Sequence, residues 1–149
     1  MRVFIGIEFI DPIKQYLKDV QDTMKTTIVS GDFTLYSNFH LTLKYIGQIY
    51  NHEYDELCQC IDDVCENTSA FPIKINDIGV FHKKNSSILW VGVHDLQHDL
   101  KKLYNNLEHE IIASGFDADD RKYRPHVTLG KKVIFLFLGL PYLSSNKTG

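Results

Sequence analysis

The sequence predicts an α+β fold, with residues 1–149 forming a single domain. Stretches with strand-like alternation are interspersed with stretches of helical periodicity. Two alternating stretches flank a turn at residues 83–86, which is typical of an antiparallel hairpin. A four-residue phrase, His-Leu-Thr-Leu at 40–43, returns as His-Val-Thr-Leu at 126–129. These observations indicate two related halves, each with one copy of the phrase and antiparallel pairing.

The composition is that of a soluble globular protein, with 44% hydrophobic and 23% charged residues. Three cysteines, Cys58, Cys60 and Cys65, lie within one predicted helix and are expected to be reduced thiols, which indicates a cytoplasmic protein. No stretch reaches the length of a membrane span, and the first apolar run is too short for a signal peptide, so no membrane association is expected. A net charge of -3 argues against a broad nucleic-acid surface, so phosphate binding should be local.

The first half is predicted as strand, helix and strand. The apolar run at 2–9 indicates a mostly buried strand. Asp11-Pro12 begins an amphipathic helix that ends near Thr26. Residues 30–38, around Gly31-Asp32, are expected to form a polar turn before the first repeat strand at 39–46.

The second half begins with a predicted helix at 53–67, in which Cys58 and Cys65 are expected on the packed face. A strand at 71–81, interrupted near 76–77, pairs with one at 88–93, where Trp90 is expected in the core. A third helix at 95–114 ends at Gly115. The second repeat strand begins at His126, and the apolar tail at 133–143 is expected to extend it.

Each phrase places a histidine and a threonine on one face of a strand, because residues i and i+2 point to the same side. Attack of an oxygen nucleophile on phosphorus needs a base on one side and an acid on the other. Histidine can take either role near neutral pH, and threonine hydroxyls can donate to phosphoryl oxygens. No metal-ligand set or cofactor motif is evident, and none is expected.

The paired phrases and their flanking residues resemble the two-histidine (2H) phosphoesterase superfamily, in particular its RNA 2',3'-cyclic phosphodiesterase branch, historically called 2'-5' RNA ligases. The stretches that carry this resemblance are Arg-Val-Phe-Ile-Gly-Ile at 2–7, Asn-Phe-His-Leu-Thr-Leu-Lys-Tyr-Ile-Gly at 38–47, Ile-Leu-Trp-Val-Gly-Val at 88–93 and Arg-Lys-Tyr-Arg-Pro-His-Val-Thr-Leu at 121–129. The resemblance implies a bilobal fold, with two pseudo-symmetric lobes of antiparallel sheets and helices around a central cleft.

The resemblance also implies metal-independent hydrolysis of 2',3'-cyclic phosphates, on RNA or nucleotides, to 2'-phosphates. We expect the protein to be a monomer. It makes His40 and His126 the acid and base, and it makes Thr42 and Thr128 the phosphate-binding residues. By analogy His126 is the base and His40 the acid, an order that the sequence leaves open. Two alternatives remain: 2'-5' RNA ligation in the same site, and a non-catalytic protein that binds RNA ends.

Other residues are weaker candidates. Lys131 stands where the family commonly has a phosphate-binding arginine, and a bulge at Gly130 would turn it toward the cleft. Tyr45 is a possible RNA contact, although strict alternation favours packing in the core. Arg124, together with Arg121 and Lys44, is either an RNA contact or a solvated surface residue. His94 and His98 are interpreted as a solvated helix end rather than a metal site. From about residue 133 the apolar tail departs from the family pattern, which we interpret as a truncated or altered C-terminal segment.

Overall fold

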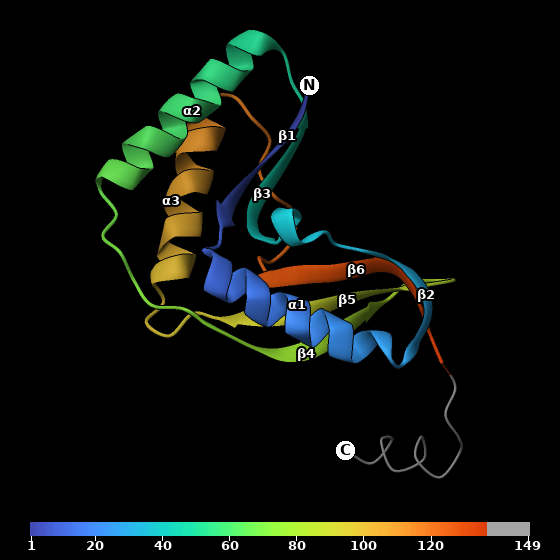
Figure 1. Cartoon of the computed structure of the whole chain (residues 1–149). Coiled ribbons are helices and arrows are strands. Elements are labelled where there is room, and N and C mark those ends of the chain that lie inside the picture. The colour runs from blue at the N-terminus through green and yellow to red at the C-terminus, as the bar shows by residue number, and fades with distance from the viewer. Residues whose placement is uncertain (137–149) are drawn as a thin grey trace.

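The computed structural model describes residues 1–136, which form three α-helices and six strands (Figure 1). In chain order the elements are β1 (Arg2–Glu8), α1 (Asp11–Lys25), β2 (Ile28–Phe33), a 3-10 turn (Tyr36–Asn38), β3 (His40–Gln48), α2 (Asn51–Glu66), β4 (Lys74–His82), β5 (Ser87–His94), α3 (Asp99–Ala113) and β6 (His126–Phe135). The α+β class is confirmed.

Two antiparallel sheets carry the two phrases. A two-stranded sheet pairs β1 with β3, which holds the first phrase. A four-stranded sheet has the order β2-β6-β5-β4, and its inner strand β6 holds the second phrase. Helix α1 lies across one face of the larger sheet, and α2 and α3 pack side by side near the smaller one (Figure 1). The two sheets, one for each phrase, agree with the fold that the resemblance implies.

The expected turn at 30–38 is wrong over its first residues, because β2 is an edge strand there. Phe33 pairs with Gly130 and Asp32 with Lys131 of β6. The hydrogen bonds of this strand come from a partner about a hundred residues later, so Gly31-Asp32 gives a misleading local signal. As a result, the segment that follows β2 lies beside the second phrase.

Strand β1 is less buried than the sequence predicts. Its residues alternate between the two faces, with Ile5 buried and Phe4 49% exposed. Phe4 and Gly6 pair with Tyr45 and Thr42 of β3 and share their face. The phenyl ring of Phe4 is therefore available to the site.

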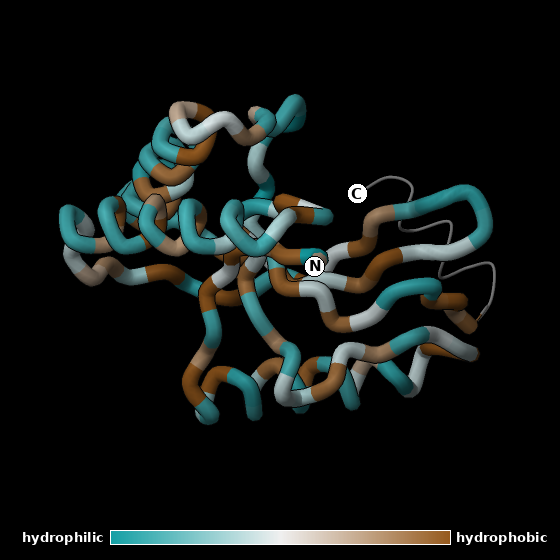
Figure 2. The backbone as a smooth tube through the Cα atoms, turned by 90° about the horizontal axis from the view of Figure 1, so that it is seen from above, coloured by the Kyte–Doolittle hydropathy of each residue, from teal (hydrophilic) through white to brown (hydrophobic). Residues whose placement is uncertain are grey.

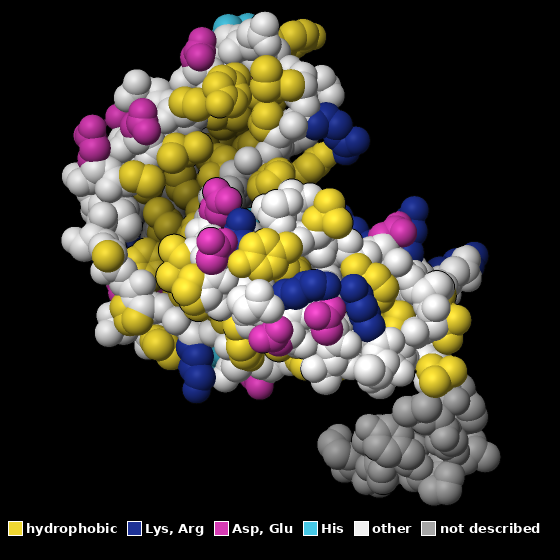
Figure 3. All heavy atoms as spheres, in the orientation of Figure 1, with side chains coloured by type: hydrophobic (Ala, Val, Ile, Leu, Met, Phe, Trp, Pro, Cys, Tyr) yellow, Lys and Arg dark blue, Asp and Glu magenta, His cyan; other side chains and the backbone are white. Residues whose placement is uncertain are grey.

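The hydrophobic core runs continuously between the sheets and the inner faces of the helices. Figure 2 shows hydrophobic and hydrophilic residues interspersed along the helices and strands. In α2 the buried thiol is that of Cys60, whereas Cys58 is half-buried and Cys65 exposed, so the expected packing of Cys58 and Cys65 is wrong. All three cysteines are free. Figure 3 shows hydrophobic side chains gathered over the α2–α3 side of the molecule, beside the smaller sheet.

Helix α3 begins at Asp99, four residues later than predicted. The carboxylate of Asp95 accepts hydrogen bonds from the backbone N–H groups of Leu100 and Lys101, at 2.9 Å each. Because the side chain of Asp95 satisfies these N–H groups, it stands before the helix rather than in it. Leu96, which fits the apolar stripe, is exposed.

Strand β6 continues the second phrase into the predicted apolar tail. Val133 is buried, and the strand ends at Phe135. The rest of the predicted tail, within residues 137–149, lies outside the described residues. Within residues 1–136 no helix is long and apolar enough to cross a bilayer.

Candidate active site

The second phrase is followed by a β-bulge. Thr128 pairs with Trp90, and Gly130 pairs with the next residue, Leu89, so Leu129 is skipped. Two successive residues, Leu129 and Gly130, are consequently buried. The alternation reverses at this point, and Lys131 lies with the histidine and threonine instead of on the opposite face.

The first phrase is followed by the same irregularity. Thr42 pairs with Gly6 and Lys44 with Ile5, so Leu43 is skipped. Leu43 and Lys44 are both buried, and Tyr45 returns to the face of His40 and Thr42 with 55% of its surface exposed. The expected packing of Tyr45 in the core is therefore wrong, for the same reason that Lys131 reaches the cleft.

A hollow of about 340 Å³ separates the two phrases. Both histidines and both threonines line it, together with Lys131. The remaining wall comes from the segment after β2 and its neighbours: Asp32, Phe33, Thr34, Leu35 and Asn38. The structure thus brings together the four residues of the repeated motif and the cation expected beside them.

The two imidazoles are held in the same way. Nδ1 of His40 lies 2.6 Å from the carbonyl oxygen of Asn38, and Nδ1 of His126 lies 2.7 Å from that of Arg124. A carbonyl oxygen can only accept, so Nδ1 carries the proton in both rings. Nε2 is then left for proton transfer, as an acceptor in the neutral ring and a donor in the charged one. In His40 it also lies 3.0 Å from the hydroxyl of Thr42.

Aromatic rings support each histidine. Phe4 stacks on His40 with ring centroids 4.6 Å apart. Phe81 meets His126 edge-on at 5.2 Å, and Trp90 lies 6.3 Å from the same ring. Trp90 is half-buried and pairs with Thr128, so its predicted place in the core is wrong.

Trp90 has room because of Gly79 on the neighbouring strand. A Cβ atom at Gly79 would meet the indole ring at 2.0 Å, so only glycine allows the ring to lie there.

Phe4 and Phe81 were not identified from the sequence as site residues. The sequence did contain a signal for Phe4: it lies two residues before Gly6, so both point to the same face of β1, the face that lies beside the first phrase.

Gln21 and Thr34 were also missed. The Thr34 hydroxyl donates to the carbonyl oxygen of Thr128 at 3.0 Å. Gln21 is buried, and its amide donates to the carbonyl oxygens of Thr34 and Leu129, both at 2.9 Å. A glutamine four residues after Leu17, on the apolar stripe of α1, was the sequence signal for such a buried contact.

A second, wider hollow of about 960 Å³ adjoins the first at Thr42 and His126. Arg124, Arg121 and Tyr45 line it, so the structure places these three candidate RNA contacts next to the motif. Arg2 donates to the hydroxyl of Tyr45 at 2.6 Å. Lys44 is in neither of its expected roles, since its ammonium is paired with Glu108 and Asp119 beneath the strand.

The remaining histidine candidates lie elsewhere. His94 pairs with Asp77 at 3.0 Å, and His98 directly precedes α3. Among residues 1–136 no three His, Cys, Asp or Glu side chains are grouped so that they could hold a metal ion.

The model of the 2'-5' RNA ligase superfamily matches residues 37–134, which include both phrases. The chain belongs to this superfamily. A superfamily relative from Methanothermobacter thermautotrophicus, named RNA 2',3'-cyclic phosphodiesterase, is 26% identical over 132 residues, which are 88% of this chain and 71% of that protein. The protein of the same name from Thermotoga maritima is 27% identical over 135 residues, 88% of this chain and 70% of that protein.

Several solved structures share this fold. TT0787 of Thermus thermophilus superposes with a TM-score of 0.77 at 15% identity, covering 93% of this chain and 82% of that chain. Escherichia coli LigT in its apo form gives a TM-score of 0.68 at 19% identity, covering 93% of this chain and 76% of that chain. LigT has also been solved in complex with 3'-AMP, where the TM-score is 0.65 at 18% identity over 93% and 76% of the two chains.

Proposed function

We propose that this protein hydrolyses 2',3'-cyclic phosphates at RNA or nucleotide ends to 2'-phosphates, with His40 and His126 as the acid-base pair. One observation carries the proposal: both imidazoles line a single hollow, and each is held by Nδ1 so that Nε2 is left for proton transfer. The names of the relatives and the LigT complex with 3'-AMP support a nucleotide substrate.

The reaction can be written with His126 as base and His40 as acid. Nε2 of neutral His126 takes a proton from water as the water oxygen bonds to phosphorus. The bond from phosphorus to the 3'-oxygen breaks, and Nε2–H of charged His40 gives that oxygen a proton. The product carries a 2'-phosphate and a 3'-hydroxyl. The two histidines end with exchanged protonation states, which solvent then resets.

Charge on the phosphoryl oxygens builds up between the strands during this step. Thr42, Thr128 and Lys131 line the hollow and would donate to those oxygens. The wider hollow, with Tyr45 and Arg124, would receive the nucleoside and the RNA strand. We infer a monomer, and from its free cysteines a cytoplasmic one.

The deciding experiment follows the opening of 2',3'-cyclic AMP, and of a short RNA ending in a cyclic phosphate, in the presence of EDTA. We expect 2'-phosphate products. His40→Ala and His126→Ala should each lower kcat by roughly a hundredfold or more. His109→Ala, on the exposed surface of α3, is the matched control and should leave kcat unchanged.

Three other results would contradict the proposal in different ways. Full activity in both variants would remove the histidines from the mechanism. Tight binding of the cyclic-phosphate RNA without turnover would indicate a binding protein. Joining of the cyclic end to a 5'-hydroxyl RNA, faster than hydrolysis, would indicate a ligase.

A further inference from the structure

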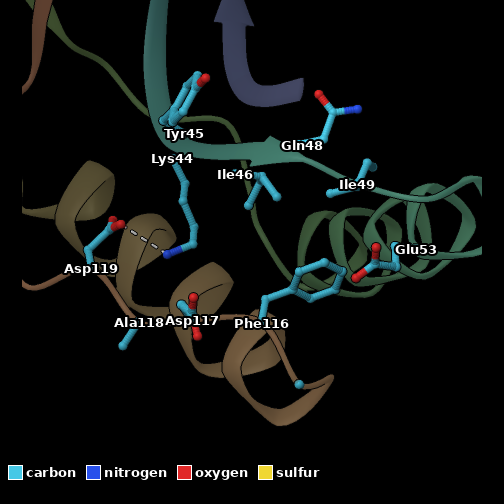
Figure 4. A pocket seen from close by; sticks show the side chains of 11 residues that line it. Lys44, Tyr45, Ile46, Gln48, Ile49, Glu53, Phe116, Asp117, Ala118 and Asp119 are labelled. Carbon is cyan, nitrogen blue, oxygen red and sulfur yellow. Dashed lines mark hydrogen bonds and ion pairs between the residues drawn. The ribbon is translucent and has the colours of Figure 1, made fainter. Parts of the chain in front are cut away.

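Lys44 is a buried cation directly beneath the first phrase. The bulge after Leu43 turns Lys44 away from the face of Thr42, and its side chain is only 4% exposed. Its ammonium contacts the carboxylates of Glu108, on α3, and of Asp119, at 3.1 Å. In Figure 4 Lys44 points down to Asp119 while Tyr45 points the opposite way.

Asp119 is held from three directions. Besides Lys44, it accepts a hydrogen bond from the Tyr104 hydroxyl at 2.5 Å. Its backbone N–H donates to the carboxylate of Glu108 at 2.8 Å. The loop between α3 and β6 is thus fixed at Asp119 to both α3 and β3.

The same loop is fixed again four residues later. The rings of Tyr104 and Tyr123 stack in parallel, with centroids 4.3 Å apart and an angle of 2° between their planes. The Tyr123 hydroxyl donates to the backbone carbonyl oxygen of Thr42 at 2.9 Å. This bond joins the segment before the second phrase to the strand of the first.

The main chain connects Tyr123 to the carbonyl oxygen that holds His126. Tyr123 precedes Arg124, whose carbonyl oxygen holds Nδ1 of His126. The next carbonyl, that of Pro125, accepts from the N–H of Val93 on β5. The position of Tyr123 therefore helps to set where the ring of His126 lies relative to Thr42 and His40.

The surroundings of this group keep its donors protonated. Burial raises the pKa of both tyrosines, with the Asp119 hydrogen bond adding to the effect at Tyr104 and the charge of Asp95 at Tyr123. For Lys44, burial lowers the pKa, but the hydrogen bonds to Glu108 and Asp119 and the charges of these carboxylates together raise it by more, so the pKa lies above its ordinary value.

We propose that Lys44, Glu108, Asp119, Tyr104 and Tyr123 form a positioning cluster that sets the separation of the two histidine half-sites. Lys44 lies beneath the strand and acts through the other residues, so it is a positioning residue rather than a catalytic one. A buried ion pair is in general a weak source of stability but can specify geometry. This inference rests on the proposed function, since it concerns the rate of that reaction.

The central test replaces one hydroxyl with hydrogen. In Tyr123→Phe the stacked ring remains, and only the bond to the Thr42 carbonyl is lost. We expect kcat for 2',3'-cyclic AMP, per folded molecule, to fall about tenfold because the two half-sites are displaced. KM should change by less than twofold, and the imidazole ¹⁵N resonances of His126 should shift. Tyr16→Phe, on α1, is the matched control and should alter none of these.

Variants of Lys44 test the same proposal independently. Lys44→Met should lower kcat at least as much as Tyr123→Phe, and Lys44→Arg, which keeps a cation between two carboxylates, should recover most of the rate. Circular dichroism gives the folded fraction used to correct each rate. If Tyr123→Phe does not fold, Tyr104→Phe replaces it, because that change removes only the hydroxyl bond to Asp119.

The outcomes separate the two proposals. Unchanged kcat and unchanged His126 resonances in Tyr123→Phe would overturn the positioning role. A change in KM alone would indicate that Tyr123 contacts the substrate, and would overturn it as well. If the unaltered protein does not turn over cyclic phosphates, the proposed function fails, and the His126 resonances still decide whether the cluster positions the ring.

Discussion

The two copies of the His-x-Thr-Leu phrase have nearly the same backbone and very different surroundings. Both are followed by a bulge, and both hold Nδ1 of the histidine on the carbonyl oxygen two residues before it. The residue after the leucine differs: in the first copy it is Lys44, paired beneath the strand, and in the second it is Gly130. The histidine, the threonine and the bulge are duplicated, while the residues that surround them are not.

The supporting rings also differ between the copies. His40 stacks on Phe4, an exposed ring, whereas His126 is bordered by Phe81 and Trp90. Only His40 has its own threonine hydroxyl within hydrogen-bonding distance of Nε2. This difference between two otherwise equivalent histidines suits a reaction in which one is the acid and the other the base.

The largest effects outside the histidines are expected at the two threonines. Under the proposed function, Thr42→Val and Thr128→Val each remove one donor to the phosphoryl oxygens, so kcat should fall by about a hundredfold. Steady-state kinetics on 2',3'-cyclic AMP measure this, with Thr23→Val on α1 as the control. Equal losses would mean that the two copies hold the phosphate equally. No loss at either position would contradict the phosphate-binding role.

The next comparison uses two adjacent lysines. Lys131 lines the motif hollow, whereas Lys132 faces Asp32 at 3.8 Å. Lys131→Met should raise KM about tenfold through loss of a cation near the phosphate, and Lys132→Met should change it by less than twofold. A larger effect at Lys132 would show that the bulge does not aim Lys131 as described.

A smaller effect is expected at the rings beside the histidines. Phe4→Leu removes the ring stacked on His40, and it should lower kcat about threefold with little loss of stability, since Phe4 is half exposed. Phe81→Leu tests the corresponding contact at His126. If Phe4→Leu matches the wild type in both kcat and its pH profile, the stacked ring does not contribute to the function of His40.

The smallest effect concerns stability at high pH. The raised pKa of Tyr104 and Tyr123 means that the folded protein keeps protons that the unfolded chain releases above pH 10. The free energy of unfolding should therefore be constant up to about pH 9 and then fall by about 1–2 kcal/mol by pH 11. Urea unfolding measures this, and Tyr123→Phe should reduce the fall. A flat profile to pH 11 would contradict the burial of these phenols.

The strongly periodic parts of the fold could be predicted from the sequence. The three helices, the β4–β5 hairpin and both repeat strands follow from apolar spacing and turn residues. Strand β2 could not, because its residues Ile28–Phe33 acquire strand structure only by pairing with β6. A short edge strand containing glycine and aspartate resembles a turn when it is considered alone.

The candidate site was predictable to the extent that it depends on alternation. Spacing of i and i+2 places His40 with Thr42, and His126 with Thr128, on one face of each strand. The fold then brings both pairs to one hollow. The places of Lys44 and Tyr45 depend on a bulge that no local pattern reveals, so a lysine that seemed solvated is buried and a tyrosine that seemed buried is exposed. Trp90 was predicted to be a core residue, but it pairs with Thr128 and its ring lies against Gly79, contacts that the sequence alone does not reveal.

The place of β6 in the sheet has a consequence for synthesis of the protein. This strand is the last described element, yet it lies between β2 and β5, which are made much earlier. A nascent chain that has not released residues 126–135 from the ribosome therefore has two unpaired strand edges and only one histidine half-site. The proposed activity should appear abruptly, when β6 inserts between β2 and β5.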